Sequence, residues 1–489
     1  MGMKIKLFAG VSWIVFIVSA AGEWGLNVDL PLTPTFWLLV AIAIFLVPAT
    51  RGATVTQVAA GQQHAVFVES DGSLWGMGQN FDGELGLGFG GYATNTPVQI
   101  IASNVTSVAC GEFHTLFRQS DGSLWAMGYN GSGQLGDGTN VSHFFPEKVV
   151  ASGVTTIAAG GEHSLFRTSS GSPLFTVGLW GMGENTLGEL GDGTTNNQYS
   201  AELLQSTASV PNQVSTMSCG AFDSFFVKHD GSLWAMGDNA SGQLGDGTTS
   251  GELSPERILS NNVVAVAAGG NHTLFLKSDG TLWGMGNDAY GQLGDNSFNQ
   301  EHSPEEIGIN VSAIAAGADH SLFLKTDGSL WAMGYNADGE LGCFTSDFYT
   351  NLPVQVVASN VVAIAAGLDN SFFIKSDGSL WGMGSDAYGT LGDAGSANVI
   401  APTRIVPPPP SPSVTGMSVA GNNVTLNCTN GLLGATYFTL TSTNITLPMN
   451  QWTRIATNQL SADGSFNIVI TNGVIPGASQ QFYRVQLVY

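Results

Sequence analysis

The sequence predicts an all-β protein, a seven-bladed β-propeller followed by a small C-terminal β-sandwich. The first observation is a tryptophan in the words L-W-x-M-G, which recurs every 48 to 55 residues, at Trp75, Trp125, Trp180, Trp234, Trp283, Trp331 and Trp381. The second is a glycine that closes A-A-G or a variant of it, at Gly61, Gly111, Gly160, Gly220, Gly269, Gly317 and Gly367. The third is a tail of short β-like runs separated by Gly, Asn and Pro. Two independent markers thus count seven units, which fill residues 54–406.

Composition excludes several classes of partner. The chain has 14 Lys and Arg against 37 Asp and Glu, a formal net charge of −23. Because proteins that bind nucleic acids or anionic lipids use basic patches, we expect neither as a partner. Charged residues make up 10% of the chain and 65 residues are glycine, which is typical of a turn-rich β protein outside the cytoplasm.

Residues 1–53 precede the repeats and contain two apolar runs, Leu7–Ala21 after Lys4 and Lys6, and Phe36–Val47. Each run is shorter than the roughly 20 residues that span a bilayer comfortably. A basic start, an apolar stretch and small residues indicate an export signal, and a membrane-anchored hairpin is the alternative. Both interpretations place the repeats outside the cytoplasm, secreted or at the cell surface, with membrane contact only through an uncleaved N-terminal segment.

Each unit is predicted to form four short antiparallel strands. In the fifth unit, V-V-A-V-A-A-G-G suits a strand packed on both faces, and H-T-L-F-L-K-S is the second strand. Asp279–Gly280 then predicts a type I′ turn, in which both residues have positive φ. T-L-W-G-M-G is the third strand, with Leu282 on one face and Trp283 and Met285 on the other. After a Gly-rich loop, S-P-E-E-I begins the outer strand.

Closure of the ring is predicted from the ends of the array. One small sheet cannot bury both faces, whereas seven sheets in a ring pack against one another. The array enters at T-V-T-Q-V-A-A-G, without an outer strand before it, and leaves at A-P-T-R-I-V, which is interpreted as the missing strand. We therefore expect one blade to combine strands from both ends of the array.

The tail begins with residues 407–414, a stiff polyproline linker. Residues 415–489 hold the β-like runs Val424–Leu426, Tyr437–Thr441, Phe466–Thr471 and Phe482–Val488, interpreted as the sandwich. The words Y-F-T-L-T-S-T-N and Q-Q-F-Y-R-V-Q resemble carboxy-terminal modules of exported bacterial surface proteins, which implies attachment or sorting.

The four cysteines are predicted to be unpaired. Cys110 and Cys219 occupy equivalent places in non-adjacent units, too far apart for a disulfide, while Cys343 lies in a loop and Cys428 in the tail.

The repeated words G-x-x-H-S-L-F-L-K-S-D-G-S-L-W-x-M-G-x-N-x-x-G-Q-L-G-D-G-T strongly resemble the repeat of the regulator of chromosome condensation family. The resemblance covers all seven units and implies a seven-bladed β-propeller. Family members include a nucleotide-exchange factor and secreted, enzyme-inhibiting bacterial proteins, so the fold alone does not define an activity.

Three recurrent residues could suggest chemistry, and each is better explained as structure. The histidines His64, His114, His163, His272 and His320, with Asp223 and Asn370 at equivalent places, lack the short spacing of metal ligands. The aspartates Asp137, Asp192, Asp246, Asp295 and Asp393 of G-D-G-T lack the D-x-[DN]-x-[DN]-G calcium pattern, and Leu87 and Cys343 replace them in two units. The seven tryptophans could form a sugar platform, but mid-strand positions favour packing between blades. No catalytic set, metal site or cofactor site is predicted.

The candidate binding residues lie where the units differ, between L-G-D and the next Pro-led strand. Aromatic residues and one histidine occur there, at Phe89, Tyr92, His143, Phe144, Phe145, Tyr199, Phe298, Phe344, Phe348 and Tyr349. Rigid scaffolds present binding residues on such loops, although these rings could instead pack on the blade edges.

We therefore expect an exported, non-catalytic propeller that binds a protein or a glycan through its loop-rich face. The first alternative is a nucleotide-exchange factor for a small GTPase, against which the export signal and the negative charge argue. The second is an enzyme at the central channel, which would require a polar cluster from one or two blades near the axis.

Overall fold

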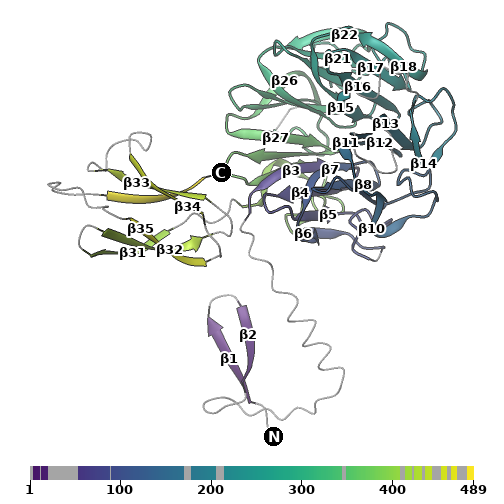
Figure 1. Cartoon of the computed structure of the whole chain (residues 1–489). Coiled ribbons are helices and arrows are strands. Elements are labelled where there is room, and N and C mark those ends of the chain that lie inside the picture. Colours follow the sequence, from purple (N-terminus) through teal and green to yellow (C-terminus); the bar gives the residue numbers. More distant parts are fainter. Residues whose placement is uncertain are drawn as a thin grey trace. The chain divides into compact units, whose positions relative to one another are not determined.

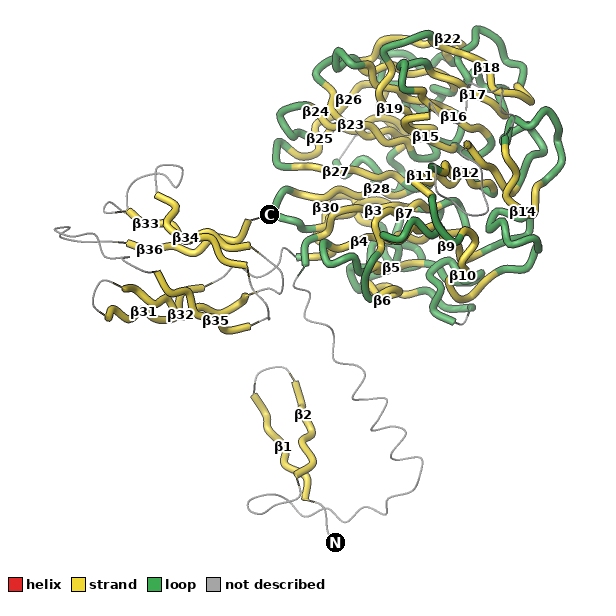
Figure 2. The backbone as a smooth tube through the Cα atoms, viewed as in Figure 1, coloured by secondary structure: helices red, strands yellow, loops and turns green. Residues whose placement is uncertain are grey.

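The computed structural model describes residues 4–10, 13–19, 53–88, 90–169, 178–204, 214–343, 348–407, 413–420, 423–431, 436–442, 453–459, 464–470 and 482–488. Secondary structure in these residues consists of strands, with no helix (Figure 2). None of the described segments forms a helix of the length and apolar character needed to cross a membrane.

Residues 55–406 form seven four-stranded antiparallel sheets, the blades of a β-propeller (Figure 1). The innermost strands are β3 (Val55–Ala60), β7 (Val105–Cys110), β11 (Val154–Ala159), β15 (Val214–Cys219), β19 (Val263–Ala268), β23 (Val311–Ala316) and β27 (Val361–Ala366). The second strands are β4 (His64–Glu69), β8 (His114–Gln119), β12 (His163–Thr168), β16 (Asp223–Lys228), β20 (His272–Lys277), β24 (His320–Lys325) and β28 (Asn370–Lys375). The third strands are β5 (Leu74–Gly78), β9 (Leu124–Gly128), β13 (Gly178–Gly183), β17 (Leu233–Gly237), β21 (Leu282–Gly286), β25 (Leu330–Tyr335) and β29 (Leu380–Gly384). The outer strands are β6 (Thr94–Ile101), β10 (His143–Val150), β14 (Gln198–Leu203), β18 (Glu252–Leu259), β22 (Glu301–Gly308), β26 (Tyr349–Val357) and β30 (Val399–Val406).

The expected closure of the ring is wrong. Every blade consists of four strands that are consecutive in the chain, and the last blade has the order β27-β28-β29-β30. The segment A-P-T-R-I-V belongs to β30, which pairs with the third strand of its own unit through Trp381 and Arg404. Because the array starts with an inner strand and ends with an outer one, all seven blades are already complete, and no strand is missing from the first.

The first and last blades, blades 1 and 7, meet without sharing a strand. The amide of Val55 donates to the carbonyl of Gly378 (3.0 Å), and the amide of Leu368 donates to the carbonyl of Gly61 (3.3 Å). Buried residues of both blades, including Phe67 and Phe372, form one apolar cluster at this junction. The ring is therefore closed by side-chain packing and hydrogen bonds alone.

Packing between blades forms the core of the propeller. Each junction has its own apolar cluster, because alternate residues of a strand point to opposite faces of the sheet. In blade 5, Leu282 packs toward blade 6, while Trp283 and Met285 pack toward blade 4, as the alternation predicted.

The hairpin between the second and third strands differs from the expected type I′ turn. Gly280 has positive φ (82°), whereas Asp279 does not. The amide of Gly280 donates to the carbonyl of Lys277, and Lys277 also pairs through its amide with the carbonyl of Thr281 (both 3.0 Å). A three-residue loop with a left-handed glycine at its end accounts for this pattern. The Asp279 carboxylate caps it by accepting from the backbone amide of Thr281.

The remaining described segments form sheets of their own. Strands β1 (Lys4–Gly10) and β2 (Trp13–Ser19) form an antiparallel hairpin, and Phe36–Val47 lies outside the described residues. The C-terminal segment has two three-stranded sheets, with orders β31-β32-β35 and β34-β33-β36. These strands are β31 (Ser413–Ala420), β32 (Asn423–Gly431), β33 (Thr436–Ser442), β34 (Thr453–Gln459), β35 (Gly464–Ile470) and β36 (Phe482–Val488). All four cysteines are free thiols.

Candidate binding face of the propeller

The blades present two different faces. Loops between the first and second strands meet loops between the third and fourth strands, as when the amide of Gln79 donates to the carbonyl of Gln63 (2.7 Å). We call this side the loop-rich face. The opposite face carries the Asp-Gly hairpins and the links between blades, joined by bonds such as that from the Val105 amide to the Gly72 carbonyl (2.9 Å).

The central channel has a volume of about 360 Å³ and is lined by the inner strands. Its walls are mostly Ala, Gly, Val and Ile, and the polar lining side chains include Gln62, Glu112 and Ser218. The Ser218 hydroxyl accepts a hydrogen bond from the backbone amide of Ala268. Gln62, Glu112 and Ser218 belong to three different blades.

The recurrent histidines connect neighbouring blades. Each Nε2 lies 2.8–2.9 Å from a hydroxyl of the next blade, in the pairs His64–Thr115, His114–Ser164, His163–Ser224, His272–Ser321 and His320–Ser371. The Ser164 hydroxyl donates in turn to the carbonyl of Gln134 (2.9 Å). Burial lowers the pKa of His114 to about 3 and that of His163 to about 4, so these rings are neutral. Their geometry serves blade packing, since each ring lies in its own junction.

Two junctions depart from this pattern. Asn370 of blade 7 takes the place of the histidine, and Ala65 of blade 1 takes the place of the Ser or Thr that would face it, so no hydroxyl is present at this position. A different hydroxyl connects these two blades, because that of Thr390 donates to the carbonyl of Gln63 (3.0 Å). Asp223 of blade 4 is buried, and burial raises its pKa well above the usual value.

The aspartates of G-D-G-T organise the long loop in the five blades that have them. In blade 2, Asp137 accepts hydrogen bonds from the amide of Thr139 (2.8 Å) and from Nδ2 of Asn130 (3.1 Å). The same loop reaches the next blade, where the amide of Gly138 donates to the carbonyl of Tyr199 (2.8 Å). These aspartates therefore hold a loop against the neighbouring outer strand.

The repeat tryptophans lie in the blades and not on an open platform. Each ring stacks on a phenylalanine of the adjacent strand, with centroids 6.0–6.5 Å apart, in the pairs Phe67–Trp75, Phe117–Trp125, Phe166–Trp180, Phe226–Trp234, Phe275–Trp283, Phe323–Trp331 and Phe373–Trp381. Lysines cover several of them, and Lys277 Nζ lies 3.4 Å from the ring centroid of Trp283.

The candidate aromatic residues lie at the edge of the loop-rich face. Phe89 and Phe344 are outside the described residues. His143, Phe144, Phe145, Tyr199 and Tyr349 are not loop residues, because they belong to the first residues of outer strands β10, β14 and β26. The exposed fractions are 68% for Tyr92, 37% for Phe144, 66% for Phe145, 42% for Tyr199, 47% for Phe298, 70% for Phe348 and 42% for Tyr349.

These rings do not form one patch. Phe144 and Phe145 lie against the glycine-rich loop of blade 1, near Gly88 and Gly90. His143 is tied to Asp137 at 2.7 Å. The edge positions therefore combine packing on the preceding blade with substantial exposure.

One aromatic cluster spans blades 5 and 6. Tyr290 contacts Tyr335 (5.0 Å between centroids) and Tyr349 (6.4 Å), and Tyr349 contacts Phe298 (5.5 Å). Phe348 adjoins the cluster in sequence and is exposed. We call these five residues the blade 5–6 aromatic cluster.

Sequence reasoning missed Tyr290 and Tyr335 because both stand inside the recurrent words. The loop pattern x-N-x-x-G keeps Asn and Gly nearly constant while its other letters vary between units. Similar pairs in other blades are Phe81–Tyr388 and Phe113–Tyr129. The sequence did contain a signal, because the residue type at these two positions of the repeat changes from unit to unit and is aromatic in some of them.

Acidic side chains accompany these rings on the loop-rich face. Burial, followed by repulsion from Glu162 and Glu184, raises the pKa of Glu112. Burial, followed by repulsion from Asp338 and Asp319, raises the pKa of Asp369. The face therefore concentrates negative charge beside exposed aromatic surface.

Comparison with known families agrees with this architecture. The RCC1-like domain model matches residues 179–437, more than half of the chain. Two models of the regulator of chromosome condensation (RCC1) repeat match residues 71–118 and 121–167, and residues 55–84 and 105–134. The chain belongs to the RCC1-repeat family of seven-bladed β-propellers, whose members are generally non-catalytic regulators or binding proteins.

Solved structures share the fold. Human WBSCR16 is 23% identical with a TM-score of 0.60, and the match covers 70% of this chain and 96% of that one. Yeast RCC1 (Prp20), solved bound to Kap60, is 20% identical with a TM-score of 0.60, over 73% of this chain and 86% of that one. A structure of Prp20p from Saccharomyces cerevisiae, described with its binding properties to Gsp1p and histones, gives the same identity and TM-score, over 73% and 88%.

Proposed function

We propose that this propeller is an exported, non-catalytic scaffold that binds a protein partner through its loop-rich face. The observation that carries the proposal is that aromatic residues at variable positions are exposed, whereas the recurrent residues of the repeat pack within and between the blades. The blade 5–6 aromatic cluster is the strongest candidate, with Phe348 70% exposed and Tyr349 42% exposed. Rigidly held aromatic side chains are favoured at the centres of protein interfaces.

Charge supports a cationic partner. The chain carries a formal charge of −23, and acidic residues such as Glu112, Glu162 and Asp369 lie on the loop-rich face. Complementary potentials steer association and exclude partners of like charge. The expected partner surface is therefore basic around an apolar centre.

Export is the part of this proposal that depends on residues 1–53. Its support is the basic start followed by apolar runs, which is typical of an export signal. Fractionation of the source cells tests it directly, since a scaffold acting outside the cytoplasm is recovered from the medium or the cell surface. A predominantly cytoplasmic pool would contradict it.

The binding experiment uses the immobilised full chain and cross-linking of proteins from surface extracts, with identification by mass spectrometry. A genuine partner is expected to be lost with the double variant Phe348→Ser/Tyr349→Ser and retained with Ile309→Ser. Ile309 is a matched control, because it is 57% exposed in a link between blades on the opposite face. A glycan array probed with the same three proteins separates carbohydrate recognition from protein recognition, and glycan binding lost only in the double variant would refute the protein partner.

Nucleotide exchange is the second candidate function, favoured only by the fold shared with yeast Prp20. A release assay with a small GTPase loaded with fluorescent GDP distinguishes it, because an exchange factor accelerates release catalytically. We expect no acceleration by this chain.

A further inference from the structure

Four positions around the long loop can be compared between blades because strand register makes them equivalent. The first is the Asn or Asp of x-N-x-x-G, and the second is the aspartate of G-D. The third and fourth lie on the outer strand, where Glu301 pairs with Gly286 and Glu305 with Gly284 in blade 5. In blade 4 the corresponding pairs are Glu252–Gly237 and Glu256–Ala235.

In blade 2, nitrogen atoms of two side chains contact the G-D aspartate. Asn130 Nδ2 donates to Asp137 Oδ1 (3.1 Å), and His143 Nε2 lies 2.7 Å from Asp137 Oδ2. Blade 3 uses an amide in place of the histidine, since Asn185 and Gln198 donate to the two oxygens of Asp192 (3.0 and 3.2 Å).

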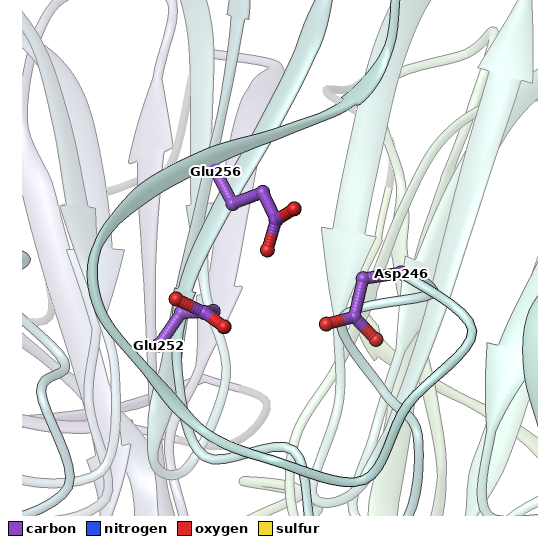
Figure 3. Close-up of side chains that lie close together, drawn as sticks. All are labelled: Asp246, Glu252 and Glu256. Carbon is purple, nitrogen blue, oxygen red and sulfur yellow. The ribbon is translucent and has the colours of Figure 1, made fainter.

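Blade 4 retains only one of these donors. Asn239 Nδ2 donates to Asp246 Oδ1 (3.0 Å), while the outer-strand position is Glu252. Asp246, Glu252 and Glu256 therefore turn their carboxylates toward a common space (Figure 3).

Blade 5 has lost both donors. Asp288 replaces the asparagine and Glu301 stands where blades 2 and 3 have histidine and glutamine. Carboxylate oxygens of Asp295, Glu301 and Glu305 lie within 4.8 Å of one another. In the described part of the chain no Lys or Arg forms an ion pair with these four carboxylates.

The buried carboxylate of Asp288 faces Asp295 of this cluster. Its Oδ1 accepts from the Leu293 amide (2.8 Å), as Asn130 Oδ1 accepts from Leu135 in blade 2. Oδ2 therefore takes the place of the amide nitrogen that faces the G-D aspartate in blades 2, 3 and 4. Asp288 is fully buried and Oδ2 has no hydrogen-bond partner.

An unpaired buried carboxylate facing another carboxylate is unfavourable unless a proton or a cation lies between them. Without a cation, burial and then the charges of Asp295 and Glu301 raise the pKa of Asp288 to about 7. Four carboxylates with no nitrogen or sulfur ligand match the preference of calcium for about six to eight oxygen ligands.

We propose that Asp288, Asp295, Glu301 and Glu305 of blade 5 form a Ca²⁺ site that links the long loop to outer strand β22. The cation takes the structural place of the amide and imidazole donors found in blades 2 and 3. Blade 4, which keeps Asn239, is the natural comparison.

The test is calorimetric titration of the EDTA-treated, dialysed full chain with CaCl₂, with MgCl₂ in parallel, together with thermal unfolding in Ca²⁺ and in EDTA. We expect the wild type to bind Ca²⁺ more tightly than Mg²⁺ and to unfold at a higher temperature in Ca²⁺. Asp288→Asn, which restores the residue of blade 4, and Glu301→Gln, which restores that of blade 3, should each remove one Ca²⁺ per chain.

Folding and binding are separable in these variants. In EDTA, Asp288→Asn is expected to unfold at or above the wild-type temperature, because its amide donates to Asp295. Glu252→Gln in blade 4 is the matched control and should leave the blade 5 stoichiometry unchanged. Absence of Ca²⁺ binding by the wild type would overturn the proposal and leave a proton shared by Asp288 and Asp295. Unchanged binding in both blade 5 variants, or loss of that site in Glu252→Gln, would overturn it as well.

Discussion

At the scale of single residues, the recurrent side chains of the repeat make their contacts within the ring of blades. Nε2 of His272 bonds the hydroxyl of Ser321 in the next blade, and the Ser321 hydroxyl donates to the carbonyl of Gln292 (2.7 Å). Such a chain of bonds satisfies buried polar groups that would otherwise cost about 1–3 kcal/mol each. The other ring nitrogen of His272, Nδ1, has no hydrogen-bond partner among the described residues, but the whole side chain is buried and out of reach of solvent.

The buried histidines predict a specific response to acid. Burial, with repulsion from His320 next, lowers the pKa of His272 to about 3, below its value in the unfolded chain. The unfolded state therefore binds the proton first, and stability falls as the pH drops below about 6.5. His272→Asn, which introduces the residue that blade 7 has at Asn370, should remove about one proton from the uptake on unfolding near pH 5.

Urea unfolding between pH 4 and 7 measures this, as the slope of the unfolding free energy against pH. An unchanged slope in His272→Asn would contradict the neutral, buried imidazole. Asp288 and Glu340 act in the opposite direction, because burial raises the pKa of each to about 7 and protonation then favours the folded state. The difference between variant and wild type isolates the histidine.

At the scale of the strand, glycines at the ends of the inner strands set how closely the blades approach. A Cβ built on Gly269 would lie 2.4 Å from the carbonyl oxygen of Gly317, and the same relation runs around the ring until Gly367 meets Gly61. These glycines have ordinary negative φ, so close approach and not backbone conformation requires them.

Gly269→Ala is therefore expected to destabilise the propeller by about 1–3 kcal/mol through overpacking. Gly308→Ala is the matched control, because a Cβ at Gly308 meets no atom within 4 Å. Denaturant unfolding of the two variants gives the comparison. Equal stabilities would show that the inner ring is looser than its geometry indicates.

The strands of the blades and the faces of their side chains could be predicted from the sequence, because the same residue types recur at equivalent positions in seven units. Trp283 and Leu282 were assigned to opposite faces from alternation alone. The rim could not be predicted in the same way, because contacts such as Tyr290 with Tyr335 join different blades and follow no local pattern. Asp288 was visible as a change from Asn, but its missing hydrogen-bond partner depends on the fold.

At the scale of the whole molecule, closure depends on the junction between blades 7 and 1. The sequence suggested a shared strand there, whereas the structure closes the ring through an apolar cluster that includes Phe67. The blade to which β30 belongs is decided by its pairing with β29 across the long loop between them, which the repeated sequence pattern does not specify. Because no strand is shared between blades 7 and 1, side-chain packing at this junction must stabilise the ring as much as packing at each of the other junctions does.

Substitution at the junction tests whether it does. Phe67→Ala removes a fully buried ring between blades 7 and 1, and Phe166→Ala removes the equivalent ring between blades 2 and 3. Each is expected to cost about 3–5 kcal/mol. A much smaller loss for Phe67→Ala, measured by denaturant unfolding, would indicate a weak junction.

The most direct test of the closed ring is native-state hydrogen exchange of amides whose acceptors lie across that junction. The amide of Val55 donates to Gly378, and the amide of Ala394 donates to Asn95 (2.8 Å). Val105, which donates to Gly72 at an internal junction, is the reference for Val55. Closure predicts protection of Val55 and Ala394 comparable to that of internal junctions, whereas exchange at the rate of an unstructured peptide would contradict a closed seven-bladed ring.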